Sequence, residues 1–339
     1  MSWWDFILRL IEGLSGPAPA PTPEPAPIPT DQPDDPLPEA VQPVRPRVFL
    51  VVYDPVIPSR GGRRLTEVRG WNAALELANA YIADLKAASH NYVDYNIVGT
   101  KVMDSLPVKI DGYQYDPDEY IALLEAGSGF HQPDGVDYDA ILADFDIVEK
   151  VNNAHIDEIW MFGPPYGGFY ESVMAGPGSF WCNAPPLSNV PVNRRFIIMG
   201  FSYERGVGEM LESMGHRAES IMEYVHRHIR SDSNLWKKFI RYEKTHPGKA
   251  EVGNIHFAPN SRHDYDWGNT DMVLSRCDSW FNFPDLSGEP RQVNSQEWGA
   301  GDTRQHHTWW LRHFPHVPGR TGGILNNWWA YVINPNKAE

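Results

Sequence analysis

One stretch, residues 194–230, constrains the fold of this chain more than any other. A short apolar run, Phe196 to Phe201, is typical of a buried strand, and it leads into a long helical pattern. Acidic residues and one histidine share a stripe of that helix that is roughly 80° wide at about 100° per residue. The members are Glu209, Glu212, His216, Glu219 and Glu223. A stripe that holds four carboxylates and one imidazole, and no lysine, indicates a candidate functional site.

Apolar runs alternate with helical patterns along most of the chain. Strands are predicted at Arg47–Tyr53, Tyr92–Val98, Ile156–Phe162 and Arg195–Phe201. Helices are predicted at Trp71–Ala88, Asp116–Ala126, Tyr138–Asn152 and after Gly206. This alternation predicts an α/β fold with a mostly parallel sheet and flanking helices. Ligands of such sheets bind beyond the carboxyl ends of the strands, here near Asp54, Glu171 and Glu204.

The C-terminal quarter differs from the rest of the chain in composition and in the periodicity of its apolar residues. From Gly253 onward it contains seven of the 13 tryptophans and six of the 13 histidines, with poor periodicity and many turn residues. We expect long Trp/His-rich loops with few regular elements, lying over the sheet. Loops of this kind often carry functional residues.

The N-terminal region is predicted to be separate from the body. Residues 1–14 form an amphipathic pattern that would dock on a protein or membrane surface, and residues 15–46 read as a Pro-rich linker. Residues 47–339 would then form a single α/β domain. Neither a classical signal peptide nor a transmembrane run of apolar residues is recognisable, which favours a cytoplasmic or peripherally tethered location.

Composition excludes some classes of partner and leaves others open. The net charge of −15 argues against nucleic acid, because phosphate binding needs a basic patch. The segment Gly163–Gly168 is glycine-rich but lacks the GxGxxG spacing, so no nucleotide cofactor is expected. A small molecule, a peptide or a glycan remain as substrate classes.

The helix stripe predicts a divalent-metal site, for zinc or a similar ion. His216 and Glu219 are one turn apart and can hold one ion, and a third ligand would come from His256, His306 or His307. A remaining carboxylate, Glu209 or Glu212, would act as general base on a water molecule. Glu171 and Glu204, which follow two predicted strands, are the other catalytic candidates.

Two other interpretations of these residues stay open. The stripe could be the solvated face of an amphipathic helix, although Gly208 and Gly215 suggest that another segment packs closely there. Alternatively, two carboxylates such as Glu171 and Glu204 could act without metal on a sugar held by aromatic side chains. Tryptophans are more often core and loop anchors than sugar platforms.

Several longer motifs resemble a family of uncharacterised bacterial proteins that are often secreted or surface-linked. They are YERGVGEMLESMGHRAES (203–220), PYGGFYESVMAGPG (165–178), GNIHFAPNSRHDYDW (253–267), HHTWW and NNWW. The resemblance implies no particular reaction. The residues themselves favour a metal-dependent hydrolase, with two alternatives: a non-catalytic carbohydrate- or surface-binding module, and a structural or cargo protein recruited by its N-terminal helix.

Overall fold

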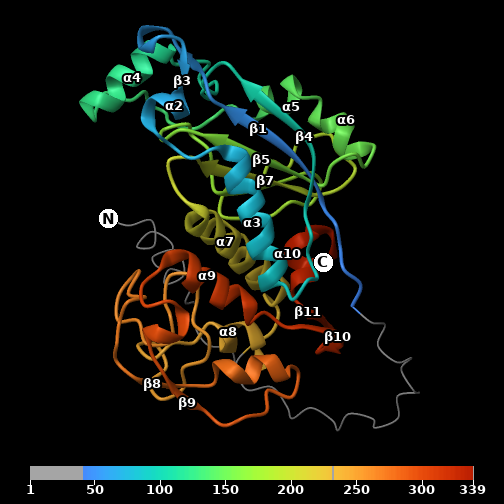
Figure 1. Ribbon diagram of the computed structural model, residues 1–339. Coiled ribbons are helices and arrows are strands. Elements are labelled where there is room, and N and C mark those ends of the chain that lie inside the picture. Colours follow the sequence, from blue (N-terminus) through green and yellow to red (C-terminus); the bar gives the residue numbers. More distant parts are fainter. Residues whose placement is uncertain (1–40, 231–232, 339) are drawn as a thin grey trace, which may run out of the picture. The chain divides into compact units, whose positions relative to one another are not determined.

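The computed structural model describes residues 41–230 and 233–338 (Figure 1). The predicted docking helix 1–14, and the linker up to residue 40, lie outside the described residues. The last linker residues belong to the body, because the backbone N–H of Val44 donates to the carbonyl of Tyr92 at 2.7 Å. The ordered body therefore begins before residue 47, where the sequence analysis placed it.

A five-stranded sheet forms the centre of the body, in the order β4-β1-β5-β7-β6. Its strands are β1 (Arg47–Tyr53), β4 (Asn96–Met103), β5 (Glu158–Gly163), β6 (Ser172–Ala175) and β7 (Phe196–Ser202). The first four strands of that order run parallel, and β6 pairs antiparallel with β7. The predicted α/β class with a mostly parallel sheet is confirmed.

Two sequence predictions need adjustment within this sheet. Strand β4 begins at Asn96 and not at Tyr92, because the chain turns at residues 89–91 and then enters the core with buried Tyr92, Val93 and Tyr95 before the strand starts. Strand β6 was not predicted at all. It has only four residues, all buried, so it shows no alternation, and turn-rich segments flank it on both sides.

Helices cover both faces of the sheet. Alternate residues of β1 enter two separate cores: Val48 and Leu50 contact the side of α3 (Ala74–Ala88) and α7 (Val207–Val225). Phe49 and Val51 contact the side of α5 (Tyr138–Asp144) and α6 (Ile147–Asn152). The single helix predicted over 138–152 is interrupted at Asp146, which has a φ of 51°. The remaining elements of this part are α2 (Leu65–Arg69), α4 (Pro117–Ala126), β2 (Val56–Ile57), β3 (Arg63–Arg64) and a 3-10 turn at Pro58–Arg60.

The C-terminal segment is more regular than the sequence suggested. The segment follows α8 (Leu235–Phe239) and contains the helices α9 (Thr303–Arg312) and α10 (Trp329–Ile333). Its short strands are β8 (Val273–Ser275), β9 (Arg291–Val293), β10 (His316–Thr321) and β11 (Ile324–Asn327). Its 3-10 turns are Cys277–Asn282, Ser295–Trp298 and Pro335–Lys337. The expectation of loops lying over the sheet is corrected in one respect: α9 packs against α7 and α3, which separate it from the sheet (Figure 1).

Tryptophan side chains in this segment are mostly structural. Of the seven from Trp267 onward, six are buried, and Trp280, Trp310 and Trp328 pack with Phe239 and Phe314 in one aromatic cluster. Aromatic pairs in edge-to-face contact stabilise such a core beyond the burial of their area. The interpretation of these residues as core anchors fits their burial.

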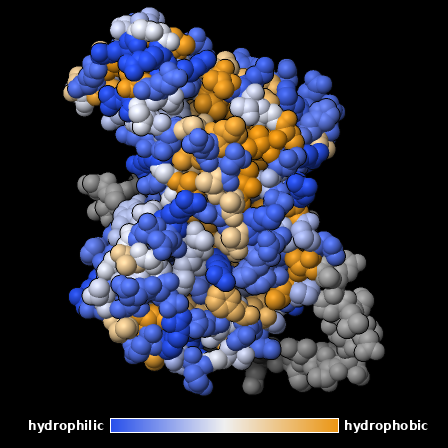
Figure 2. Space-filling model, in the orientation of Figure 1, coloured by the Kyte–Doolittle hydropathy of each residue, from blue (hydrophilic) through white to orange (hydrophobic). Residues whose placement is uncertain are grey.

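The exposed surface carries some apolar residues at the open edge of the sheet. Strand β4 leaves Val98 and Val102 44% and 52% exposed, and Figure 2 shows apolar surface over the part of the molecule that holds β1 and β4. Within the described ranges, no helix is long and apolar enough to cross a membrane.

Candidate metal centre

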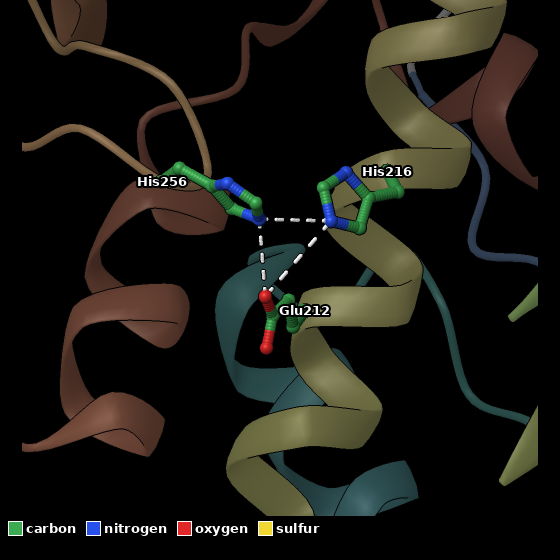
Figure 3. Close-up of side chains that lie close together, drawn as sticks. All are labelled: Glu212, His216 and His256. Carbon is green, nitrogen blue, oxygen red and sulfur yellow. Dashed lines mark hydrogen bonds and ion pairs between the residues drawn. The ribbon is translucent and has the colours of Figure 1, made fainter. Parts of the chain in front are cut away.

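Three potential ligand atoms converge between α7 and the loop that follows α8 (Figure 3). His216 Nε2 lies 3.0 Å from His256 Nε2, and His256 Nε2 lies 3.1 Å from Glu212 Oε1. The third side of the triangle, from His216 Nε2 to Glu212 Oε1, measures 3.9 Å. The helix supplies Glu212 and His216 because residues four positions apart share one face. Of the three histidines proposed as third ligand, His256 is the one that reaches this pair.

Gly215 explains how the loop that bears His256 comes so close to the helix. A β-carbon at position 215 would overlap the side chain of Ile255. The backbone N–H of Ile255 in turn donates to Glu219 Oε1 at 3.2 Å. Asn254 Oδ1 accepts the backbone N–H groups of His256 and Phe257, which closes a tight turn around the imidazole. The close packing that the helix glycines suggested is present here.

Each imidazole is oriented by a carboxylate on its other nitrogen. His216 Nδ1 lies 3.2 Å from Glu219 Oε2, and His256 Nδ1 lies 2.9 Å from Asp264 Oδ1. A carboxylate can only accept, so Nδ1 of His216 carries the hydrogen that faces Glu219, while Nδ1 of His256 lies within ion-pair distance of Asp264. The Nε2 atoms of both rings face the centre, where a metal would bind. Metal-binding histidines are oriented by the same kind of outer carboxylate. Glu219, proposed as a ligand from the sequence, therefore holds His216 from the side opposite the triangle.

Negative charge dominates the electrostatics of the centre. Burial lowers the pKa of His216, but the hydrogen bond and charge of Glu219, with the charges of Glu171 and Glu212, raise it overall to about 9. Burial opposes ionisation of Glu212, yet its hydrogen bonds with His256 and Tyr265 lower its pKa to about 2. The same arrangement of charges that favours a proton on His216 would favour a divalent cation.

Tyr265 also belongs to the centre, and the sequence analysis missed it. Its hydroxyl donates to Glu212 Oε1 at 2.9 Å and lies 3.3 Å from His256 Nε2. The residue has a φ of 59°, a conformation that is costly for an aromatic side chain and that often marks functional sites. Burial, together with the charge of Glu212, raises the pKa of the phenol, which keeps it protonated. Tyr265 is half exposed, so its hydroxyl is placed between the ligand atoms and solvent.

Glu171 connects the centre to a cleft. Its Oε2 lies 3.9 Å from His216 Nε2 and accepts a hydrogen bond from Asn183 Nδ2. Glu171 also lines a cleft of about 810 Å³ between the segments that follow β5 and β7, where parallel sheets bind ligands. Glu204 and Glu209 line the same cleft. Asp54, the third strand-end candidate, is buried and accepts from Thr66.

Glu209 has a local structural partner. Its Oε2 accepts the backbone N–H of Gly206 at 3.1 Å, which caps the first turn of α7. Glu204 is exposed beside it. Neither carboxylate belongs to the group of ligand atoms formed by Glu212, His216 and His256 in the described part of the chain. Both remain candidates only for contact with a ligand in the cleft.

His306 and His307 lie on α9 and are fully buried. His307 Nδ1 contacts the carbonyl of Gly208 at 2.9 Å, where a β-carbon would meet Thr303 and Arg304 at 3.0 Å. His306 stacks on Trp267 with ring centroids 4.8 Å apart. Burial lowers the pKa of His307 to about 4, so the ring is neutral. The two histidines pack the helix pair behind the centre and lie outside the ligand triangle.

A second group of potential ligands, formed by Cys277, Asp278 and His313, is less suited to a metal. Arg291 holds the Asp278 carboxylate with two contacts of 2.5 and 2.9 Å, which neutralises its charge. Burial raises the pKa of the Cys277 thiol to about 12. Cys182 and Cys277 are separate buried thiols.

Comparison of the chain with protein-family models, curated proteins and solved structures gave no match. The chemistry of the centre is therefore inferred from its own side chains. Its donor set of two imidazoles and one carboxylate suits zinc and similar divalent ions.

Proposed function

We propose that this protein is a metal-dependent hydrolase whose divalent ion is held by Glu212, His216 and His256. One observation carries the proposal: the Nε2 atoms of two histidines face each other at 3.0 Å while a carboxylate lies against each Nδ1. In the absence of a metal, a proton on one of these nitrogens accounts for their separation, and a divalent cation can take the place of that proton. The structural alternative of a solvated helix face does not account for a buried Glu212 and His256.

The spacing of the three atoms fits the ion. Ligand atoms about 2.0–2.2 Å from a tetrahedral zinc lie roughly 3.3–3.6 Å from one another. The three separations of 3.0, 3.1 and 3.9 Å bracket that range. Three protein ligands are also the number found at catalytic zinc sites, where a fourth position is left for water or substrate.

A bound divalent ion would supply Lewis acidity and lower the pKa of a coordinated water to about 7. Glu171 has the position of a general base, since it lies 3.9 Å from His216 Nε2 and faces the cleft. It would take a proton from the attacking water and return it to the leaving group. The Tyr265 hydroxyl, which donates to Glu212 in this structure, would turn its hydrogen to the oxygen on which negative charge develops. In this proposal Glu212 is a ligand and not the base.

The alternative of a carbohydrate-binding module built on the Trp-rich loops is less favoured, because six of the seven tryptophans from Trp267 onward are buried. The proposed recruitment through residues 1–14 involves residues that the structure does not describe.

Metal analysis tests the hydrolase proposal. Protein purified without chelator should contain about one equivalent of zinc or a similar ion, and its melting temperature should fall in EDTA. His216→Ala and His256→Ala should abolish the bound ion. Glu223→Gln is the matched control, because Glu223 lies on the same helix stripe but is exposed. Absence of stoichiometric metal, with an unchanged melting temperature in EDTA, would exclude the proposal.

A further inference from the structure

The cleft beside the centre contains two solvent-exposed tyrosines. Tyr166 is 45% exposed and Tyr170 is 41% exposed, and both line the cleft of about 810 Å³ to which Glu171 also belongs. Trp71 adds a third, partly buried ring to the same wall. Large aromatic side chains usually bury most of their area, so several exposed rings in one concave surface require an explanation.

Tyr166 is held in place by contacts that fix its backbone. It has a φ of 58°, which is unfavourable for a bulky side chain. The fully buried Lys109 donates from Nζ to the carbonyl of Tyr166 at 2.5 Å and to Asp134 Oδ1 at 2.6 Å. One turn position away, the carbonyl of Pro165 accepts from the Tyr120 hydroxyl at 2.6 Å. A strained backbone that is held this firmly is characteristic of functional sites.

The ring of Tyr166 is also fixed from one face. It stacks on Phe130 with centroids 3.6 Å apart and planes 13° from parallel. The stack immobilises the ring, and the exposed part of Tyr166 remains available inside the cleft. A rigid ring loses little conformational entropy when a ligand stacks on it. The geometry is therefore that of a preformed platform.

Charge in the cleft narrows the class of ligand. Four carboxylates, those of Asp134, Glu171, Glu204 and Glu209, line it together with two guanidinium groups, those of Arg69 and Arg205. An anionic polymer would meet an excess of negative charge. A neutral molecule with many hydroxyl groups can donate to the carboxylates and accept from the arginines. Sugar rings combine those hydroxyls with a face of C–H groups, which stacks on aromatic rings.

We propose that the substrate is a neutral glycan chain, whose sugar rings stack on Tyr166 and Tyr170 along the cleft and lead to the metal centre at Glu171. This inference rests on the proposed hydrolase function for its last step, but the binding of the chain does not require the ion. A substitution can therefore abolish glycan binding without affecting metal binding, and the reverse.

A binding titration with a panel of neutral oligosaccharides of four to six sugar units tests the inference. At least one should bind saturably, and Tyr166→Asn and Tyr170→Ala should each raise its Kd roughly tenfold, the effect of losing one stacking contact. Asparagine at position 166 accepts a positive φ, so this variant removes the ring without adding backbone strain. Phe281→Ala is the control, because Phe281 is 40% exposed and does not line the cleft.

Two further measurements separate this inference from the hydrolase proposal. His216→Ala should lose the metal and retain oligosaccharide binding, whereas Tyr166→Asn should lose oligosaccharide binding and retain the metal. The inference is overturned if no member of the panel binds, or if binding is unchanged in both tyrosine variants. Saturable binding of unmodified peptides that depends on the same tyrosines, in place of oligosaccharides, would overturn it in favour of a peptide substrate.

Discussion

Gly215 of α7 lies directly against the side chain of Ile255, and a β-carbon on residue 215 would overlap it. The contact brings the turn at Asn254 onto the helix, so that His256 faces His216. A residue without chemistry of its own thus sets the distance between the two histidines. Glycine inside a helix costs up to about 1 kcal/mol relative to alanine, so its presence here calls for a packing reason.

Replacement of Gly215 by alanine should therefore weaken metal binding. The added methyl displaces the loop at Ile255, and overpacking of this kind costs about 1–3 kcal/mol, more than the gain in helix propensity. We expect the metal affinity to fall at least tenfold, measured by competition with a chromophoric chelator. Ile255→Ala in the same chain makes room for the methyl and should restore part of the affinity. Unchanged affinity in the single variant would show that the loop tolerates displacement.

The outer carboxylates provide a second prediction. Glu219→Gln removes the negative charge beside Nδ1 of His216, and Asp264→Asn removes the one beside Nδ1 of His256. Both variants keep an oxygen acceptor at that position. Loss of such partners lowers metal affinity by about 10- to 100-fold in comparable centres. Each variant should still bind one equivalent at saturating metal, measured by the same competition assay. Glu223→Gln should behave as wild type, and a general loss of affinity in it would indicate a non-specific charge effect.

Arg217 should be essential for stability. Its guanidinium is fully buried and donates to both oxygens of Glu158 at 2.8 and 2.7 Å, while Tyr95 and Trp160 donate to the same carboxylate. Arg217→Met leaves that carboxylate buried without its cation, and the free energy of unfolding should fall by about 3–5 kcal/mol. Urea denaturation measures the change.

An exposed ion pair serves as the comparison. Arg60 bonds Glu125 at 2.5 Å with both side chains about half exposed, so Arg60→Met should cost under about 1 kcal/mol. Equal effects of the two substitutions would contradict the importance assigned to the buried pair.

Stability should also depend on pH through two buried histidines. Burial lowers the pKa of His226 and of His313 to about 4, below the value of about 6.5 in an unfolded chain. The unfolded state therefore takes up protons first as the pH falls. Their contribution to stability is complete above pH 6.5 and is lost progressively towards pH 4, by roughly 2–3 kcal/mol for each histidine.

Urea denaturation between pH 7 and 4.5 checks this dependence. His226→Gln, whose amide can still donate to the carbonyl of Met222, should reduce the slope of stability against pH. The exposed His263 provides the control, and His263→Gln should leave the slope unchanged. A slope that is equal in wild type and His226→Gln would show that His226 is already protonated in the folded protein.

Local patterns in the sequence were sufficient for one part of the centre. Helical spacing places Glu212 and His216 on one face, and Gly208 and Gly215 signalled that other segments pack against that helix. His256 could be named as a candidate but not distinguished from His306 and His307, because a loop contact across 40 positions leaves no periodic signal.

Other features depend on long-range packing and could not be predicted from the sequence. Tyr265 and Asp264 join the centre through the shape of one turn, and only the folded chain places them near Glu212 and His256. Helix α9 was missed because its buried stripe consists of His306, His307, Trp310 and Leu311, and the two histidines do not count as apolar in a search for a helical face. The mostly parallel sheet with helices on its faces followed from the simple alternation of strands and helices, whereas the strand order is known only from the structure.

Arg217 follows His216 directly in α7, about 100° further around the helix axis. Its guanidinium also donates to the carbonyl of Val332, so the helix is fastened to β5 and to α10 on a face adjacent to the one that bears His216. Turning α7 enough to swing His216 away from His256 would pull this buried cation from its carboxylate. The orientation of the His216 imidazole is thus fixed by a buried ion pair in the core that contacts neither the proposed ion nor the proposed substrate.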